Sequence, residues 1–377
     1  MQQTVLSVAQ VEASMPDSAA VLSAGLGPGP FALIIVFVSP EADLPVLAQN
    51  LQQCFGETPV IGCTTAGEIT AEGYGEGMIV AAGLPARYFS AAPLLIPDLA
   101  RIDVHAVIGD LIRARGALAR ACPSWEHEFA FLMVDGLSTK EDALTSALAS
   151  GLGAMPLFGG SAADGTRFLE TFVLHGGQLL RNAAVLAVVR TQCPLKVFKF
   201  DHFRPTETRM VVTSAEPSKR IVHQINAEPA AWEYARLLGK DPAQLNPFTF
   251  AAHPVVVRIG GRHHVRSIRQ VEDNGDLVFY SAIDEGLVLT LAEPLDMVAH
   301  LASEFDSLAT SMPPLAILAC DCVLRRMEAQ EKQLSTQLSA ILRHNRVTGF
   351  STYGEQFNAM HVNQTLTGVA FYAPESV

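Results

Sequence analysis

Side chains that can form hydrogen bonds are concentrated between residues 349 and 372, in GFSTYGEQFNAMHVNQTLTGVAFY. Segments 350–353 and 366–372 are rich in β-prone residues, so two predicted strands hold the polar residues between them. Polar side chains presented between core strands are typical of a ligand-binding wall. The alternative is a connection in which Asn and Gln side chains bond to their own backbone. The ligand-binding candidates in this stretch are Glu355 and Asn363.

Two histidines lie among aromatic and aliphatic residues, a setting that suits a haem group. A haem needs an imidazole for its iron, apolar side chains for its porphyrin faces and cations for its propionates. The sequence has no C-x-x-C-H motif, so any such group would be haem b held without covalent bonds. Either histidine could bind the iron, and the alternative for each is an ordinary histidine with one hydrogen bond. The residues that would form this site are His202, His361, Arg204, Tyr353, Phe357 and Met360.

Two loops of small residues, 62–68 (GCTTAGE) and 159–165 (GGSAADG), suggest close approach of the backbone to another group. Gly160 and Ser161 are therefore further ligand candidates. Neither loop has the lysine of a phosphate-binding loop or the dinucleotide fingerprint. The segment 159–163 approaches G-x-S-x-G but ends in alanine, so an enzyme using Ser161 or Cys63 is the weakest interpretation. We expect a protein that is not an enzyme.

Composition limits the classes of partner. The chain has 377 residues, a formal net charge of −12 and 49% hydrophobic residues. An acidic chain without a basic run is a poor ligand for nucleic acids or anionic membranes. The N-terminus lacks the features of a signal peptide, and the longest apolar run (31–38) is too short to span a bilayer. The six scattered cysteines suggest no disulfide framework, and we expect a cytoplasmic protein.

The elements that must position these residues alternate between strand and helix in the first half and become rich in hairpins later. This pattern predicts an α/β fold of two domains, 1–200 and 201–377, with mixed β-sheets flanked by helices. Segment 31–38 is expected as a buried strand, and segment 324–344 as one long charged helix. That helix could form a homodimer or kinase interface, or it could be simply an exposed amphipathic helix.

Three motifs resemble the FIST family in order and spacing: IGCTTAGEI (61–69), FGGSAADG (158–165) and GFSTYGEQFNAMHVNQTLT (349–367). The resemblance runs from about residue 25 to the end and implies an N-terminal and a C-terminal FIST domain. It also implies a bacterial sensory module that binds a small ligand and reports to a histidine kinase or a cyclic-di-GMP enzyme.

Within the family, the chain is most similar to stand-alone haem proteins that sense nitric oxide. It carries DHFRP (201–205) and AMHVNQT (359–365), although Val362 separates the histidine from Asn-Gln-Thr, which directly follow it in the commoner pattern. The resemblance therefore implies a haem-dependent nitric oxide sensor that regulates a partner histidine kinase. The alternative is a haem-free sensor of a small metabolite such as an amino acid. In that case the polar groups of the metabolite would form hydrogen bonds with Glu355, Asn358, Asn363 and Gln364.

Overall fold

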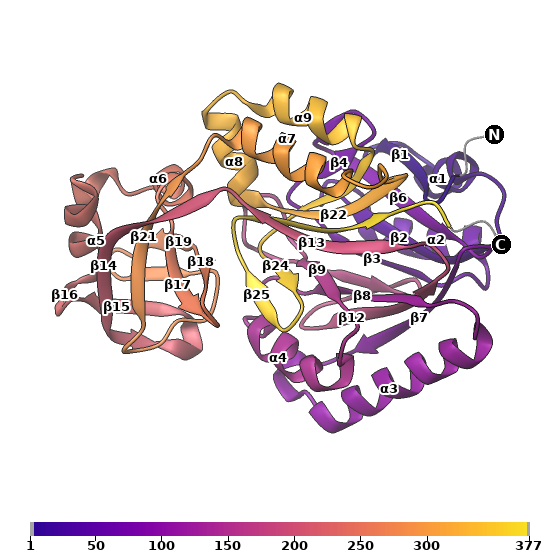
Figure 1. Ribbon diagram of the computed structural model, residues 1–377, viewed down its shortest axis with the longest axis horizontal. Coiled ribbons are helices and arrows are strands. Elements are labelled where there is room, and N and C mark those ends of the chain that lie inside the picture. The colour runs from indigo at the N-terminus through magenta and orange to yellow at the C-terminus, as the bar shows by residue number, and fades with distance from the viewer. Residues whose placement is uncertain (1–3, 375–377) are drawn as a thin grey trace.

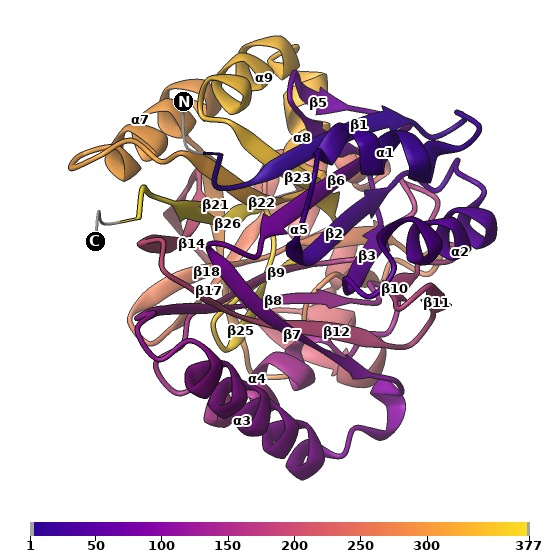
Figure 2. The same ribbon diagram turned by 90° about the vertical axis from the view of Figure 1, so that its right-hand side faces the viewer.

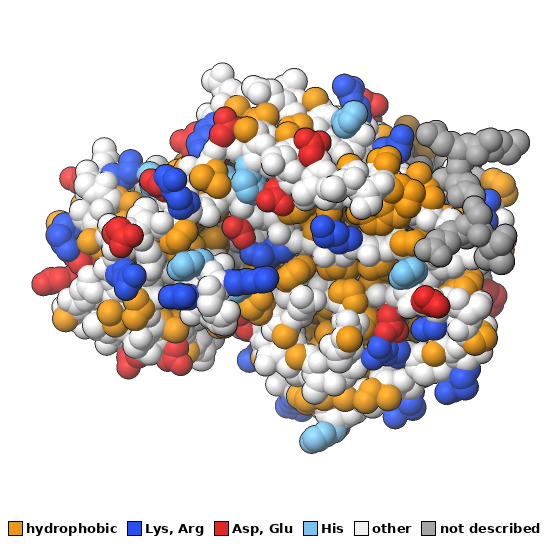
Figure 3. Space-filling model, in the orientation of Figure 1, with side chains coloured by type: hydrophobic (Ala, Val, Ile, Leu, Met, Phe, Trp, Pro, Cys, Tyr) orange, Lys and Arg blue, Asp and Glu red, His pale blue; other side chains and the backbone are white. Residues whose placement is uncertain are grey.

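The computed structural model describes residues 4–374 and shows a body of three mixed sheets with a smaller lobe projecting from one side (Figure 1). The lobe comprises residues 203–294, and the body comprises the remaining described residues. Figure 3 shows an indentation in the outline where the lobe meets the body. The predicted α/β class with mixed sheets flanked by helices is confirmed.

Each sheet of the body has six strands. The first has the order β1 (Ser7–Glu12), β6 (Met78–Pro85), β2 (Phe31–Val38), β3 (Val60–Thr64), β10 (Val173–His175) and β11 (Gln178–Leu180). The second has the order β25 (Met360–Val362), β24 (Glu355–Phe357), β9 (Leu157–Ser161), β8 (His127–Val134), β12 (Ala184–Thr191) and β7 (Phe89–Ile96). The third has the order β13 (Leu195–Asp201), β26 (Thr365–Phe371), β22 (Ala316–Cys322), β23 (Val347–Thr352), β4 (Glu68–Thr70) and β5 (Gly73–Gly75).

The three sheets meet in one apolar core because their buried faces carry large hydrophobic side chains. Phe37 of the first sheet stacks on Phe350 of the third with ring centroids 4.7 Å apart. Phe131 packs on Phe158 within the second sheet at 4.8 Å. The predicted buried strand at 31–38 is confirmed as β2, in the middle of the first sheet.

Helices cover the outer faces of the sheets (Figure 2). The first sheet carries α1 (Ser18–Leu26) and α2 (Leu44–Phe55), and the second carries α3 (Val104–Ala121) and α4 (Glu141–Leu152). The third carries α7 (Met297–Leu308) and α9 (Ser335–His344), and α8 (Val323–Glu331) lies between this sheet and the lobe. The single helix predicted over 324–344 is wrong, because the chain turns between α8 and α9 with Gln333 in the left-handed region at φ 57°.

The lobe is an eight-stranded antiparallel sheet with two short helices. Its strands are β14 (Phe203–Glu216), β15 (Ile221–Ile225), β16 (Glu228–Pro229), β17 (Val255–Ile259), β18 (Arg262–Arg266), β19 (Ile268–Val271), β20 (Leu277–Phe279) and β21 (Val288–Pro294). Its helices are α5 (Ala230–Leu238) and α6 (Pro247–Ala252). The chain returns to the body after β21, so the predicted second domain, 201–377, is spread over the lobe and part of the body.

Candidate functional site

The polar stretch predicted as a ligand wall lies where the lobe meets the body, a region we call the junction. Gln364 Nε2 donates to the carbonyl of Ala251 in the lobe at 2.6 Å. Arg266 of the lobe donates to the carbonyl of His361 at 3.1 Å. The hydroxyl of Ser281 in the lobe donates to Asn363 Oδ1. The stretch therefore joins the lobe to the body.

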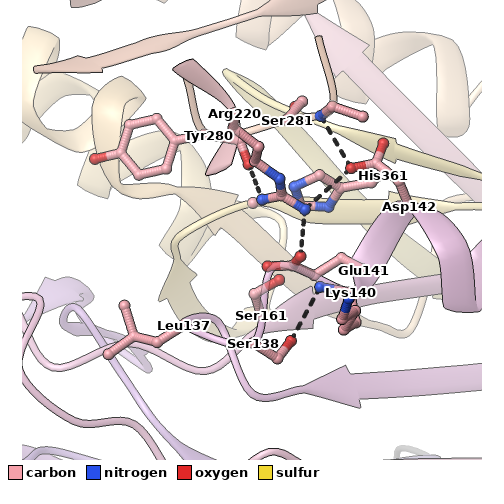
Figure 4. Close-up of polar contacts among 12 residues, drawn as sticks. Leu137, Ser138, Lys140, Glu141, Asp142, Ser161, Arg220, Tyr280, Ser281 and His361 are labelled. Atoms are coloured by element: carbon pink, nitrogen blue, oxygen red, sulfur yellow. Dashed lines mark hydrogen bonds and ion pairs between the residues drawn. The ribbon is translucent and has the colours of Figure 1, made fainter. Parts of the chain in front are cut away.

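A buried ion pair also links the lobe to the start of α4. Arg220 Nη2 lies 2.6 Å from Glu141 Oε2 and 3.2 Å from Asp142 Oδ2. Arg220 Nη1 donates to the carbonyl of Tyr280. Figure 4 shows these side chains converging from the lobe and the body, with His361 in the same cluster. Because Glu141 and Arg220 are almost fully buried, each depends on the other for compensation of its charge.

Several buried polar atoms in and beside the junction have no hydrogen-bond partner within residues 4–374, among them Asn363 Nδ2, Gln356 Oε1 and Arg266 Nε. A Cβ added to Gly354 would lie 2.7 Å from His361 Nε2 and 2.9 Å from Asn363 Nδ2. At the edge of the junction is a cavity of about 50 Å³ bordered by Arg220, Glu141, Tyr280 and Tyr353. Such a volume holds water rather than a metabolite.

The surroundings of His202 do not fit a haem. Its ring is fully buried, with Nε2 2.9 Å from Glu328 Oε2 and Nδ1 2.7 Å from Arg325 Nη1. Both ring nitrogens are thus engaged by charged side chains, and neither is free for iron. Burial lowers the pKa of His202 below its ordinary value, so the imidazole is neutral. Arg204 forms an exposed ion pair with Glu293 on the lobe.

The surroundings of His361 do not fit a haem either, because a porphyrin needs apolar side chains on both faces. The ring is buried beside Gln356, with their nitrogens 3.3 Å apart, and it lies in the field of the charged groups of the junction. Burial lowers its pKa, so this imidazole is neutral as well. Phe357 and Met360 are only partly buried. Haem binding therefore stays a prediction. The side chains around His202 and His361, as they are arranged here, form no apolar pocket for a porphyrin.

The two loops of small residues predicted to approach another group border a larger cavity, of about 240 Å³, which we call the α8 cavity. It opens beyond the carboxyl ends of the parallel strands β2 and β3, where ligands of open α/β sheets commonly bind. Its remaining walls are one face of α8 and the segments 39–41 and 76–77. The lining side chains include Ser39, Glu41, Thr65, Glu76, Arg326 and Gln330, with Gly67 and Gly165 from the loops.

Arg326 is the one nearly buried cation of that lining, with 5% of its surface exposed. Its Nη2 donates to the carbonyl of Gly75 at 2.6 Å and lies 3.2 Å from Glu76 Oε1. The side chain of Glu76 is 71% exposed, and its Oε1 also accepts from Gln330 Nε2 at 3.1 Å. A carboxylate within the cavity could take its place, because Arg binds carboxylates in a planar two-point geometry.

A second ionisable group, Glu68, ends the small-residue loop 62–68 that borders the α8 cavity. Glu68 is fully buried and bonds to the hydroxyl of Thr65 and to the backbone N–H of Met78. Burial raises the pKa of Glu68 to about 7, although these hydrogen bonds and Arg326 act in the opposite direction. This carboxyl therefore titrates near neutral pH, next to the α8 cavity.

The other sequence-predicted residues lie within the core. A Cβ on Gly160 would be 2.7 Å from Phe350 Cζ, so close packing explains this glycine. Ser161 is buried and accepts a hydrogen bond from Gln356 at 2.9 Å. Glu355 bonds to Thr365, and burial raises its pKa so that it is protonated. Burial also raises the pKa of the Cys63 thiol, which disfavours the nucleophilic thiolate.

Sequence reasoning missed Arg220, Arg326 and Glu68. The pair Arg325-Arg326 follows the buried strand β22 after two apolar residues, and an arginine pair in that position was a usable signal of buried charge. Glu68 belongs to the motif GCTTAGE, in which only the small residues were interpreted. Arg220 carried no sequence signal, because its partners Glu141 and Asp142 lie 79 and 78 residues earlier in the chain.

Comparison with known proteins identifies the family. The FIST N domain model matches residues 32–228, and the FIST C domain model matches residues 230–358. An uncharacterized protein of Methanocaldococcus jannaschii is 24% identical over 301 residues, which cover 74% of this chain and 57% of that protein. The chain thus spans little more than half the length of this relative. Among residues 4–374, no helix is long and apolar enough to cross a membrane. The chain belongs to the FIST family, with its N and C domains in the expected order.

Proposed function

We propose that this protein senses a small zwitterionic metabolite, of the amino-acid class, in the α8 cavity. The observation that carries the proposal is Arg326, a nearly buried cation that lines a cavity of about 240 Å³ and is balanced by an exposed glutamate. The carboxylate of the ligand would replace Glu76 at the guanidinium. Its ammonium group would then lie near the carboxylates of Glu41 and the displaced Glu76, which both line the cavity.

The remaining lining suits the same ligand class. The hydroxyl of Ser39 can accept from an ammonium group or donate to a carboxylate, whereas the hydroxyl of Thr65 donates to Glu68 and can only accept. Gly165, with φ of 73°, leaves the backbone of the second loop uncovered toward the cavity, because a Cβ there would meet no atom within 4 Å. A small polar ligand could therefore approach main-chain groups as well as side chains.

The output follows from the family role. A partner histidine kinase or cyclic-di-GMP enzyme would bind the ligand-bound and ligand-free forms with different affinity, since equal affinity for both would transmit nothing. The competing account is a haem-dependent response to nitric oxide. It requires His202 or His361 to leave the contacts described above and an apolar pocket to open beside it.

A thermal-shift screen tests the proposal. The wild-type protein is heated with each of the twenty amino acids, and separately with haemin. A ligand at one hundred times its Kd stabilises the folded state by about 2.7 kcal/mol, so a specific amino acid should raise Tm clearly. Arg326→Gln should abolish the shift, whereas Arg343→Gln, at an exposed ion pair on α9, should preserve it. Stabilisation by haemin and by no amino acid would contradict the proposal.

A further inference from the structure

The two chain segments that connect lobe and body are hydrogen-bonded to each other at His202. The first segment passes from β13 to β14 through His202, and the second passes from β21 to α7 through Leu295. The N–H of Leu295 donates to the carbonyl of His202 at 2.7 Å. Figure 1 shows β14 and β21 as the strands by which the lobe leaves the body. A rotation of the lobe about these two connecting segments would therefore change the backbone at or beside His202.

The side chain of His202 is fixed to α8 by two hydrogen bonds of defined direction. A guanidinium can only donate, so Arg325 Nη1 donates to Nδ1, and the ring carries its proton on Nε2 and donates it to Glu328. Arg325 Nε in turn donates to Asp321 Oδ1 at 2.8 Å, and Lys332 Nζ lies 2.6 Å from Glu328 Oε1. The imidazole is thus held between a fixed cation and a fixed anion.

The same helix forms a wall of the α8 cavity with its other face. Arg326 and Gln330 are one turn apart and line the cavity, whereas Arg325 and Glu328 lie on the side of α8 that holds His202. The lobe also contacts α8 directly, since Ala251 of α6 belongs to the apolar cluster that contains Val323 of α8. We call the two connecting segments at His202 and Leu295 the hinge. A ligand at Arg326 that displaced α8 would also displace Arg325 and Glu328, the side chains that hold the ring of His202 at this hinge.

We propose that His202, held by Arg325 and Glu328, is a hinge latch that couples the position of α8 to the orientation of the lobe. The latch deepens the proposed function, because it rests on the α8 cavity for its trigger. The latch itself exists without ligand and can be measured without one. Replacing all members of a buried polar cluster by apolar side chains is often neutral for stability, whereas removing one member leaves the others buried without a partner. The directional bonds of the latch fix one geometry, which a small movement of α8 breaks.

Hydrogen exchange measured by mass spectrometry on the ligand-free protein tests the latch. His202→Phe keeps a ring of similar size and removes both hydrogen bonds. We expect exchange in peptides covering 200–204 and 293–297 to accelerate at least tenfold, while the lobe strands β17 and β20 keep their protection. His223→Phe is the matched control, because His223 pairs with Asp276 at 2.8 Å within the lobe and away from the hinge. Its hinge peptides should exchange at the wild-type rate.

Three results would overturn the latch. One is wild-type exchange at the hinge in a folded His202→Phe protein. Another is equal acceleration throughout the body and lobe, which would indicate general destabilisation. The third is a haemin Soret band gained by the wild type and lost in His202→Phe, which would make His202 an iron ligand. If His202→Phe does not fold, Glu328→Gln keeps the shape of the site and removes its negative charge, and the same acceleration is expected.

The coupling to the cavity is a separate arm of the experiment. An amino acid that stabilises the wild type should change hinge exchange in the wild type and leave it unchanged in His202→Phe. If no amino acid binds, the proposed ligand fails, while the ligand-free comparison of His202→Phe with His223→Phe still decides the latch. If an amino acid binds at Arg326 and hinge exchange does not respond, the coupling is wrong and the ligand site stands.

Discussion

Gly67 lies directly beneath the guanidinium of Arg326. A Cβ added to Gly67 would be 2.3 Å from Arg326 Nη1 and 2.6 Å from Cζ, closer than a Cβ atom approaches other atoms in folded proteins. The glycine of the first small-residue loop is therefore required by an arginine about 260 residues later in the chain. The small-residue loop 62–68, which was recognised in the sequence, and Arg326, which was not, therefore pack against each other.

Gly67→Ala should displace Arg326 and abolish ligand binding. The control is Gly27→Ala, because Gly27 also has a positive φ, of 80°, but a Cβ there meets no atom within 4 Å and the residue does not line the α8 cavity. Both changes introduce backbone strain of about 1–3 kcal/mol, which urea unfolding will measure. Only Gly67→Ala should lose the amino-acid thermal shift. Equal loss of binding in both variants would show that strain, and not the position of Arg326, controls the site.

Glu68→Gln should remove a pH dependence of stability. The folded-state pKa of Glu68 is about 7, above the ordinary value of 4.5, so the folded state holds this proton more tightly. Its contribution is fully present below pH 4.5 and is lost as the pH rises through 7, by about 3 kcal/mol in total. Glutamine resembles the protonated carboxyl at every pH.

Urea unfolding of both proteins at several pH values between 4.5 and 8 gives the comparison. The difference in unfolding free energy, variant minus wild type, should increase in favour of Glu68→Gln as the pH rises. Taking the difference cancels the titration of other groups, such as His202 and His361. A difference that is constant with pH would mean that Glu68 titrates at its ordinary value.

Much of the fold could be predicted from local patterns, whereas the site depended on long-range pairing. The apolar run 31–38 became the buried strand β2, and the two loops of small residues border the α8 cavity. The aromatic neighbours of His202 suggested an apolar pocket. Its actual partners, Arg325 and Glu328, lie 123 and 126 residues away, and no local pattern reports such contacts.

The polar stretch at 349–372 illustrates the same limit. The sequence predicted a ligand-binding wall there, and in the structure Asn363 and Gln364 of this stretch are fully buried. Their partners, Ser281 and Ala251, are in the lobe. A sequence pattern shows that polar groups need partners, and it does not show whether these come from a ligand or from the chain itself.

Arg220→Met should destabilise the protein strongly by leaving Glu141 buried without its cation. Loss of one member of a buried ion pair costs about 3–5 kcal/mol of unfolding free energy. The matched control is Arg204→Met, because Arg204 pairs with Glu293 at the surface, with side chains 67% and 49% exposed. An exposed pair contributes about 0–1 kcal/mol. Urea unfolding distinguishes the two, and similar losses would contradict the importance of the junction ion pair.

The central claim is that Arg326 binds the carboxylate of a small metabolite, and calorimetric titration tests it most directly. The amino acid that stabilises the protein best, and its carboxamide, are each titrated into the wild type and Arg326→Gln. A charge-assisted hydrogen bond contributes about 1.5–3 kcal/mol, so removing either partner should weaken binding about tenfold or more. Removing both should add little further loss, because the two changes remove the same interaction. Additive losses, or equal binding of acid and amide by the wild type, would contradict the account.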